Sequence, residues 1–168
     1  MEIILCAKRV LDPRLPSATF HSYIQDNRLQ ISSNVPYVLS TFDEYALELA
    51  LRLKDTSDAH ITVMTLGPQV AQDVLRHALA MGADEAVLID NSSFGELDSF
   101  GTALALSNAI QKLGSYDLIL CGRQGADWDS GQVGPILALN LGIPAITVAR
   151  RIDALNGGVR VERTLGKG

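Results

Sequence analysis

The chain of 168 residues is long enough for one domain to bury its own core, so neither disulfides nor a metal are needed to explain its folding. Apolar residues make up 47% of the chain and charged residues 20%, which excludes the disordered and fibrous classes. The formal net charge of -5 and the pI near 5.1 exclude a protein that binds nucleic-acid backbone, because such binding needs a clustered lysine and arginine face.

The N-terminus and the cysteines indicate a protein of a reducing compartment. Met1 leads directly into a strand-like run without a basic segment or a cleavage site, and no apolar stretch approaches the roughly 20 residues that a membrane span requires. Cys6 and Cys121 both lie in strand-like apolar runs, where reduced, buried packing residues are expected. We therefore expect a soluble, cytoplasmic protein with no membrane span.

Five short runs rich in aliphatic and β-branched residues predict buried strands in chain order. Their hydrophobicity is nearly continuous, which is typical of strands that are covered on both faces. They are EIILCA at 2–7, HITVMT at 60–65, EAVLID at 85–90, DLILCG at 117–122 and PAITVA at 144–149. The segments between them carry helical signals, so the pattern predicts alternating β and α elements.

The helices have recognisable ends. Thr41 and Glu44 form a capping-box pattern, which predicts that the first helix begins with the Thr41 hydroxyl as its cap. The second helix is predicted from Gly67-Pro68 to Gly82, and the third from about Leu97 to a stop at Gly114. A fourth helix is expected to begin at 131–134, next to Pro135.

These elements predict an α/β fold with an open, doubly wound, mostly parallel sheet and helices on both of its faces. The predicted nucleotide-binding domain covers residues 1–149. Residues 13–40 form an excursion from it, with a hairpin that pairs SYIQ with RLQIS across the turn Gln25-Asp26-Asn27. Residues 150–168 alternate around Asn156-Gly157-Gly158 and are interpreted as the start of a C-terminal hairpin or arm.

The segment CGRQGADWDSGQVGP at 121–135 carries most of the chemical information in the chain. It follows a predicted buried strand and contains four glycines, two carboxylates and small polar residues. Glycines let a ligand approach the backbone closely, and the free N–H groups at the start of the next helix attract a phosphate. The alternative is a glycine-rich turn that joins strand to helix without a ligand.

Other site motifs are absent from the sequence or incomplete. There is no G-x-x-x-x-G-K-[ST] loop, no G-x-G-x-x-G after the first strand and no G-x-S-x-G elbow. A calcium loop is rejected because Gln132 and Ala138 stand where glycine and a bidentate Glu are needed. The histidines, which are His21, His60 and His77, have no metal-ligand spacing, so we predict no metal site.

Four charged residues allow more than one interpretation. Asp127 and Asp129 could form an acid/base pair, but paired acids in a polar loop are usually solvated. Lys8 and Arg9, just past the first strand, could meet a phosphate or a partner acid, or remain solvated.

Several separated stretches resemble the β subunit of electron-transfer flavoproteins. They are LCAKRVLD, STFDEYALELALRLKD, TLGP, RHALAMGADEAVLID and CGRQGADWDSGQVGP, and they cover most of residues 2–145 in the order of that family. The resemblance implies a Rossmann-like domain related to adenine-nucleotide hydrolases. It also implies a heterodimer with an α subunit that holds an electron-carrying FAD, while the β subunit binds AMP or a second FAD.

The implied role is one-electron flavin transfer between flavin dehydrogenases and a quinone reductase or similar acceptor, without a catalytic side chain on this chain. A stand-alone ATP-binding protein of the universal-stress type is the alternative, and an adenylating ligase is disfavoured because the residues after strand one do not form its loop.

The resemblance also implies which residues contact the nucleotide. By motif position they are Cys6, Ala7, Ser40, Thr41, Phe42, Asp43, Leu66, Gly122, Arg123, Gln124, Gly125, Ala126, Asp127, Trp128, Asp129, Ser130, Gly131, Gln132 and Val133.

The sequence departs from the family pattern at a few positions. Ser40-Thr41 replaces the usual Asn-Pro, and Gly125-Ala126 stands where Ala-Ile is usual. Gln-Val-Gly-Pro at 132–135 is similar to the branch that bifurcates electrons, and Trp128 replaces a residue that is often glycine. An indole at this position could stack on a flavin or block it, so AMP and FAD both remain open. The chain also stops short of the usual family length, as expected of a fragment or a reduced relative.

Overall fold

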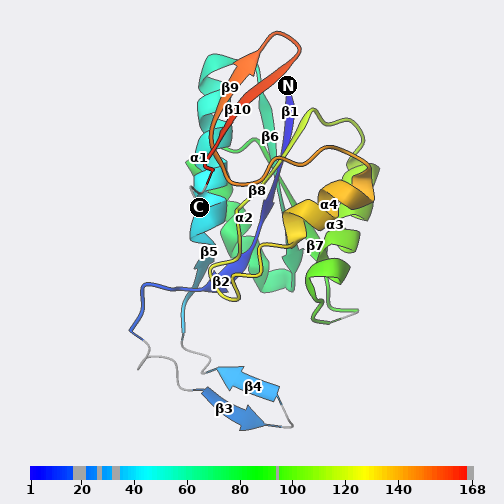
Figure 1. Cartoon of the computed structure of the whole chain (residues 1–168). Coiled ribbons are helices and arrows are strands. Elements are labelled where there is room, and N and C mark those ends of the chain that lie inside the picture. Colours follow the sequence, from blue (N-terminus) through cyan, green and yellow to red (C-terminus); the bar gives the residue numbers. More distant parts are fainter. Residues whose placement is uncertain (17–21, 26–27, 32–34, 94, 166–168) are drawn as a thin grey trace.

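A computed structural model describes residues 1–16, 22–25, 28–31, 35–93 and 95–165 of the chain. Its centre is a four-stranded sheet in the order β7-β6-β1-β8, in which every neighbouring pair is parallel. The strands are β1 (Glu2–Ala7), β6 (His60–Gly67), β7 (Glu85–Asp90) and β8 (Leu118–Cys121). Four of the five predicted strands are therefore confirmed, and so is the α/β fold with a mostly parallel sheet (Figure 1). Their predicted burial holds for β1 and β6, whereas β7 at the sheet edge is at most half-buried.

The strand order reverses at β1. The chain adds β6 and β7 on one side of β1, and then returns to place β8 on the other side. In open α/β sheets, such a reversal leaves a crevice beyond the carboxyl ends of the two strands on either side of it, because the connections leave in opposite directions. The carboxyl ends of β1 and β8 therefore mark where a ligand site is expected.

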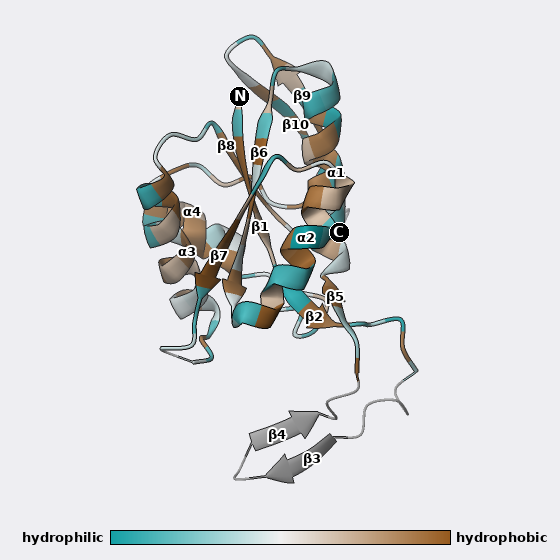
Figure 2. Cartoon of the chain, turned by 180° about the vertical axis from the view of Figure 1, so that it is seen from behind, coloured by the Kyte–Doolittle hydropathy of each residue, from teal (hydrophilic) through white to brown (hydrophobic). Residues whose placement is uncertain are grey.

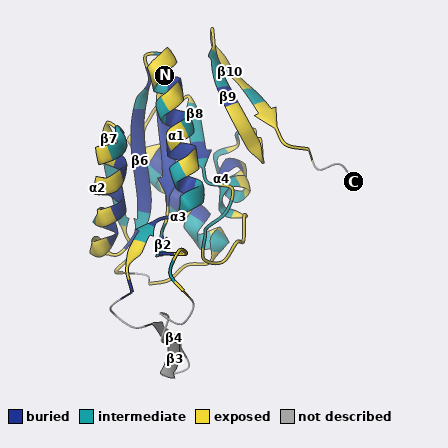
Figure 3. Cartoon of the chain, turned by 90° about the vertical axis from the view of Figure 1, so that its left-hand side faces the viewer, coloured by how far each residue is buried: buried dark blue, intermediate teal, exposed yellow. Residues whose placement is uncertain are grey.

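Helices cover both faces of the sheet, and residue alternation along β1 decides which helices meet which side chains. The helices are α1 (Thr41–Thr56), α2 (Gln72–Met81, after a 3-10 turn at Gln69–Ala71), α3 (Ser99–Leu113) and α4 (Val133–Leu141). Ile3 and Leu5 face the core under α1 and α2, whereas Ile4 and Cys6 face the core under α3 and α4. Figure 2 shows these two helical layers on opposite sides of the sheet, and Figure 3 shows the buried strands between them.

The predicted helix ends agree with the structure except at the start of α2, which begins at Gln72 after a 3-10 turn and not at Gly67-Pro68, because β6 continues to Gly67. Gly82 and Gly114 follow the last residues of α2 and α3 as expected, and α4 begins at Val133. The cap of α1, however, is Ser40 and not Thr41. The backbone N–H groups of Asp43 and Glu44 both donate to the Ser40 carbonyl at 2.9 Å, so Ser40 is the cap and Thr41 is the first helical residue, as predicted for the helix start. The capping box is wrong because no side chain caps this helix in the described part of the chain.

Three antiparallel pairs lie outside the main sheet. β2 (Arg9–Leu11) pairs with β5 (Tyr37–Leu39), and between them β3 (Ser22–Gln25) pairs with β4 (Arg28–Ile31), which confirms the predicted hairpin of the excursion. Its turn at 26–27, together with Ser32 and His21, lies outside the described residues. β9 (Ala149–Leu155) and β10 (Gly158–Arg163) form the predicted C-terminal hairpin, which packs against α1 through Ile152.

The predicted fifth buried strand at 144–149 is wrong. The chain from 143 to 147 has no strand structure and its residues 144–147 are exposed, and β9 begins only at Ala149. Val148 adopts a positive φ of 57°, which redirects the chain. The backbone carbonyl of Thr147 accepts a hydrogen bond from Arg163 Nε at 2.8 Å, and that of Val148 accepts one from Thr164. The polar backbone groups of this segment are thus used by the C-terminal hairpin and not by the central sheet.

Candidate functional site

Asp43 joins three elements at the reversal point of the sheet. One of its carboxylate oxygens accepts the backbone N–H of Lys8, just after β1, at 2.8 Å. The other accepts the backbone N–H of Gly122, just after β8, at 3.0 Å. Because Asp43 lies in the first turn of α1, this one side chain holds the ends of two strands and the start of a helix together.

The Asp43 carboxyl is buried, and burial raises its pKa from 3.8 to about 7. The two backbone hydrogen bonds oppose this shift, because N–H donors favour the charged form. Both oxygens point at the protein backbone. Asp43, which the sequence places among the nucleotide contacts, therefore uses both of its carboxylate oxygens within the protein.

Gly122 is required by this packing. A Cβ atom at Gly122 would overlap Asp43 Oδ1 and would lie only 2.8 Å from the carbonyl carbon of Phe42 and 2.9 Å from the nitrogen of Asp43. Gly125 is similarly tight, with Asp127 Oδ1 at 2.6 Å from an ideal Cβ. The glycines at the start of the loop thus allow close packing within the protein as well as close approach to a ligand.

Lys8 and Arg9 both meet acids of this chain. Lys8 Nζ lies 2.7 Å from Asp127 Oδ2, so an ion pair bridges the segment after β1 and the loop after β8. Arg9 Nε pairs with Asp73 at 2.8 Å and its guanidinium lies 3.9 Å from the centre of the Tyr37 ring. The sequence left open whether Lys8 and Arg9 meet a phosphate, pair with an acid or remain solvated, and the structure supports pairing with an acid.

The outer part of the loop is accessible to solvent. Trp128 has 79% of its surface exposed, and Asp129 adopts a positive φ of 53°. Gln124 donates to Asp129 at 2.7 Å, and the hydroxyls of Ser99 and Ser130 lie 3.3 Å apart, which connects the loop to the start of α3. The loop is thus ordered by its own contacts and still faces outward.

The Ser40 hydroxyl is the unusual polar group of the site. Ser40 is fully buried, and its Oγ has no hydrogen-bond partner among the described residues. A buried hydroxyl without a partner costs about 1–3 kcal/mol, so native proteins rarely keep one without a reason. The first turn of α4 also has no capping side chain within the described residues, which leaves helix N–H groups there without a side-chain partner.

The structure brings most of the predicted site residues to the carboxyl edge of the sheet, at different depths. Four are buried there, namely Cys6, Ala7, Ser40 and Asp43. Eight are half-buried, namely Thr41, Phe42, Leu66, Gly122, Gln124, Gly125, Ala126 and Val133. Seven lie on the exposed part of the loop, namely Arg123, Asp127, Trp128, Asp129, Ser130, Gly131 and Gln132. Leu66 stands apart from the reversal point, since it lies near the end of β6.

Thr65 is a residue of this edge that no sequence motif indicates. This threonine is completely buried at the end of β6, and its hydroxyl donates to the carbonyl of Ala7 at 2.8 Å, which fixes the last residue of β1. A polar residue inside the apolar run HITVMT is the signal that could have indicated it.

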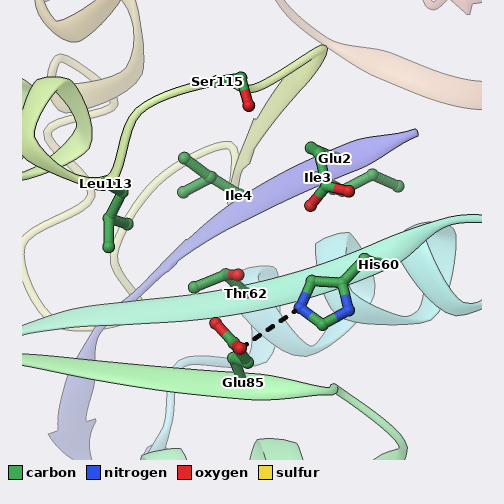
Figure 4. Close-up of a pocket in the computed structure, with 8 residues that line it drawn as sticks. All are labelled: Glu2, Ile3, Ile4, His60, Thr62, Glu85, Leu113 and Ser115. Atoms are coloured by element: carbon green, nitrogen blue, oxygen red, sulfur yellow. Dashed lines mark ion pairs between the residues drawn. The ribbon is translucent and has the colours of Figure 1, made fainter.

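Two cavities lie away from this edge. One of about 250 Å³ lies at the amino ends of the strands, where His60 Nε2 is 3.8 Å from Glu85 Oε1 (Figure 4). The other, of about 230 Å³, lies beside α1 and α2 and is lined by residues such as Tyr37 and His77. Ligands of open α/β sheets bind at the carboxyl ends, so neither cavity replaces the reversal point as the candidate site.

The described residues contain no helix that is both long and apolar enough to cross a membrane. They also contain no group of three or more histidine, cysteine or acidic side chains that could hold a metal ion.

The comparisons with known proteins agree with the resemblance found in the sequence. A family model described as the electron transfer flavoprotein domain matches residues 29–168. The chain is 42% identical to the electron transfer flavoprotein subunit beta of Megasphaera elsdenii, over 97% of this chain and 61% of that protein. It is 43% identical to the subunit of the same name from Thermoanaerobacterium thermosaccharolyticum, over 82% of this chain and 53% of that protein.

A relative with a more specific name is the caffeyl-CoA reductase-Etf complex subunit CarD of Acetobacterium woodii, which is 37% identical over 100% of this chain and 63% of its own length. The chain thus spans roughly 53–63% of the length of these three relatives. The family match covers well over half of the chain, and the relatives named as β subunits align with almost all of it. The chain belongs to the electron transfer flavoprotein family and is similar to its β subunits.

Proposed function

We propose that the chain is the nucleotide-binding part of an electron transfer flavoprotein β subunit, which binds AMP or a second FAD beyond the carboxyl ends of β1 and β8. The observation that carries the proposal is the buried, unpartnered Ser40 hydroxyl beside an accessible glycine loop at the reversal point. The names of two relatives, an electron transfer flavoprotein subunit beta and an acryloyl-CoA reductase electron transfer subunit, support a role in electron transfer.

The residues at this edge fit an adenine nucleotide. The uncapped start of α4 offers N–H groups to a phosphate, and Ser40 offers a hydroxyl to a polar atom of the ligand. The exposed indole of Trp128 offers an apolar surface for stacking. A flavin, when bound, supplies the one-electron chemistry, and the residues of this chain bind and orient it.

In this proposal no side chain acts as acid, base or nucleophile. Asp127 is paired with Lys8, and Asp129 accepts a hydrogen bond from Gln124, so both loop acids have structural partners. The chain acts as an electron-carrier subunit with an α subunit that holds FAD, between flavin dehydrogenases and an acceptor such as a quinone reductase. Residues 1–149 form the cytoplasmic nucleotide domain, and residues 150–168 begin an arm.

The test identifies the nucleotide directly. The chain is purified under native conditions, denatured by heat, and the released small molecules are identified by mass spectrometry. Titration calorimetry of the emptied protein then compares AMP, FAD and ATP. Release of AMP or FAD, and preference for that ligand over ATP, is the expected result.

Two outcomes would overturn the proposal. Preference for ATP, together with a homodimer, would indicate the stand-alone stress-type protein. A monomer that holds no nucleotide and binds none of the three would exclude both functions. Co-expression with the α subunit of one of the relatives tests the partner independently, since the proposal expects co-purification of a flavin-bearing complex.

A further inference from the structure

Cys6 and Cys121 lie directly side by side on neighbouring strands. The parallel register of β1 and β8 pairs Cys6 with Cys121, although the two residues are far apart along the chain. Both side chains belong to the same apolar cluster under α3 and α4, so they project from the same face of the sheet. Both are free thiols.

The two thiols differ in access. Cys6 is 7% exposed, whereas Cys121 is half-buried and is the last residue of β8, directly before Gly122. Gly134 of α4 lies above Cys121, and even a Cβ atom at Gly134 would be 3.8 Å from the Cys121 sulfur. Cys121 is therefore the thiol that a reagent from solvent reaches first.

The contact between the two thiols also changes the acidity of the more buried one, Cys6. The neighbouring Cys121 thiol, followed by burial, raises the pKa of Cys6 well above its ordinary value of 9.0. Cys6 therefore stays protonated until its proton is removed during a reaction, and it does not attack an external reagent first.

We propose that Cys6 and Cys121 form a redox-active dithiol, which a low-molecular-weight disulfide such as oxidised glutathione converts into an intramolecular disulfide. The register of β1 and β8 supports this directly. Neighbouring strands lie about 4.8 Å apart, and disulfides join residues whose Cα atoms are about 4.4–6.8 Å apart.

The reaction takes two exchange steps. The Cys121 thiolate attacks one sulfur of the reagent, which forms a mixed disulfide and releases one thiolate. Cys6 then loses its proton to solvent and attacks the Cys121 sulfur, which displaces the second thiolate. The pair loses two electrons and two protons, and the reagent gains them as two thiols.

The bond is expected to be reversible. Side chains that stand perpendicular to a sheet keep about the strand spacing between their Cβ atoms, whereas a disulfide prefers roughly 3.8 Å. The strands must therefore approach each other, and strained disulfides are easily reduced. The bond would tie the carboxyl ends of β1 and β8 together beneath the crevice.

The experiment uses the folded chain, oxidised glutathione and no nucleotide or partner, so its result is independent of the proposed function. After reaction, free thiols are alkylated, and the protein is analysed by intact mass and by peptide mapping. The wild type should lose two hydrogens and yield a cross-linked peptide pair containing Cys6 and Cys121, and dithiothreitol should reverse both changes.

Two matched variants separate the steps. Cys6→Ala should accumulate one stable glutathione adduct on Cys121, because the second thiol is missing. Cys121→Ala should remain largely unmodified, because the remaining thiol is buried. The unfolded wild type in urea should form the internal bond at about one tenth of the rate of the folded protein, or at a lower rate. The reason is that the long intervening loop lowers the effective concentration of the thiols.

Two results would overturn the proposal. One is a wild type that keeps a glutathione adduct on Cys121 without forming the internal bond. The other is a wild type that stays unmodified after prolonged incubation. If a variant fails to fold, the peptide map of the wild type still decides between these outcomes.

Discussion

The carboxylate of Asp43 accepts the backbone N–H of Gly122, a residue 79 positions later in the chain, at 3.0 Å. This contact closes the reversal point of the sheet, because Asp43 lies in the first turn of α1 and Gly122 directly follows β8. The lack of a side chain at Gly122 lets the two segments approach, and the carboxylate uses the resulting N–H donor. The same contact ties the stability of the fold to the geometry of the candidate site.

Gly122→Ala should lower the free energy of unfolding by about 1–3 kcal/mol, the usual cost of an added group in a packed site. The new Cβ would lie 2.8 Å from the Phe42 carbonyl carbon, which cannot move without shifting the start of α1. Urea unfolding measures the change. Gly158→Ala is the control, because an ideal Cβ there meets no described atom within 4 Å. Equal effects of the two substitutions would contradict the packing argument.

Asp43 should make the protein less stable as the pH rises. Its pKa is about 7 in the folded protein and 3.8 as the unperturbed value, because burial disfavours the charge. Between these values the folded state holds a proton that the unfolded chain has released, so the free energy of unfolding falls with rising pH, by at most about 1.4 kcal/mol per pH unit.

The comparison with Asp43→Asn isolates this effect, because the amide does not titrate. The stability of the wild type minus that of the variant should decrease from pH 5 to pH 7 and become flat above about pH 8. Urea unfolding of both proteins across this range provides the data. A difference that stays constant or increases with pH would show that Asp43 is not the titrating group.

Asp84 should have the opposite pH dependence. The hydrogen bond from Lys54 lowers the pKa of Asp84 below 3.8, with a second contribution from the Ile61 N–H. Its stabilising contribution is present above pH 3.8 and is lost as the pH falls through the folded pKa. Lys54→Met should therefore cost up to about 1 kcal/mol at pH 7, and less as the pH falls through the folded pKa of Asp84.

The control for the Lys54 pair is Arg52→Met. It removes a more exposed ion pair with Glu48 within α1. Its cost should be only about 0.3–0.5 kcal/mol, because solvent screens such pairs. Urea unfolding at pH 3 and pH 7 measures both variants. If Lys54→Met lost more free energy of unfolding at pH 3 than at pH 7, the predicted pH dependence of this ion pair would be wrong.

The sequence predicted the elements whose signals are local. The runs EIILCA and HITVMT are continuous in hydrophobicity because both faces of the sheet are covered, and Gly82 ends α2 because it adopts a positive φ of 125°. The glycine loop was identified by composition alone. Its position at the reversal point followed from the predicted alternation of strands and helices.

The failed predictions depend on contacts between residues far apart in the sequence or on a choice between neighbouring residues. Residues 144–149 have a strand-like composition, yet composition does not reveal that Arg163 binds the Thr147 carbonyl. The cap of α1 was misplaced by one residue because Ser40 and Thr41 can both cap a helix. The position of Asp43 in the site was read from a motif, and its bond to Gly122 has no local signal.

Ile152→Ala should release the C-terminal hairpin from α1 without unfolding the sheet. Ile152 is the residue of β9 that is buried in the core cluster under α1. Removing its side chain should cost about 2 kcal/mol or more of local stability. Hydrogen exchange read by mass spectrometry should become faster in β9 and β10 and stay slow in β1 and β6. Leu155→Ala, at a position with 49% exposure, should leave both regions unchanged.

Ser40→Ala should affect the stability of the ligand-free protein and its affinity for nucleotide in different ways. In the protein without ligand, the buried Ser40 hydroxyl has no partner among the described residues, so its removal should leave the free energy of unfolding unchanged or raise it. In the proposed complex the hydroxyl bonds the nucleotide. The same substitution should then weaken binding of AMP or FAD by about 5–10-fold, the loss of one neutral hydrogen bond.

Ser107→Ala is the matched control, because Ser107 is also buried and its hydroxyl already donates to the Leu104 carbonyl at 2.8 Å. This variant should lose about 1 kcal/mol of stability and keep the affinity for nucleotide. Calorimetry and urea unfolding on both variants give the two readouts. A Ser40→Ala protein that is less stable than the wild type and binds nucleotide equally well would assign Ser40 to the fold alone, because the hydroxyl would then serve the protein and not a ligand.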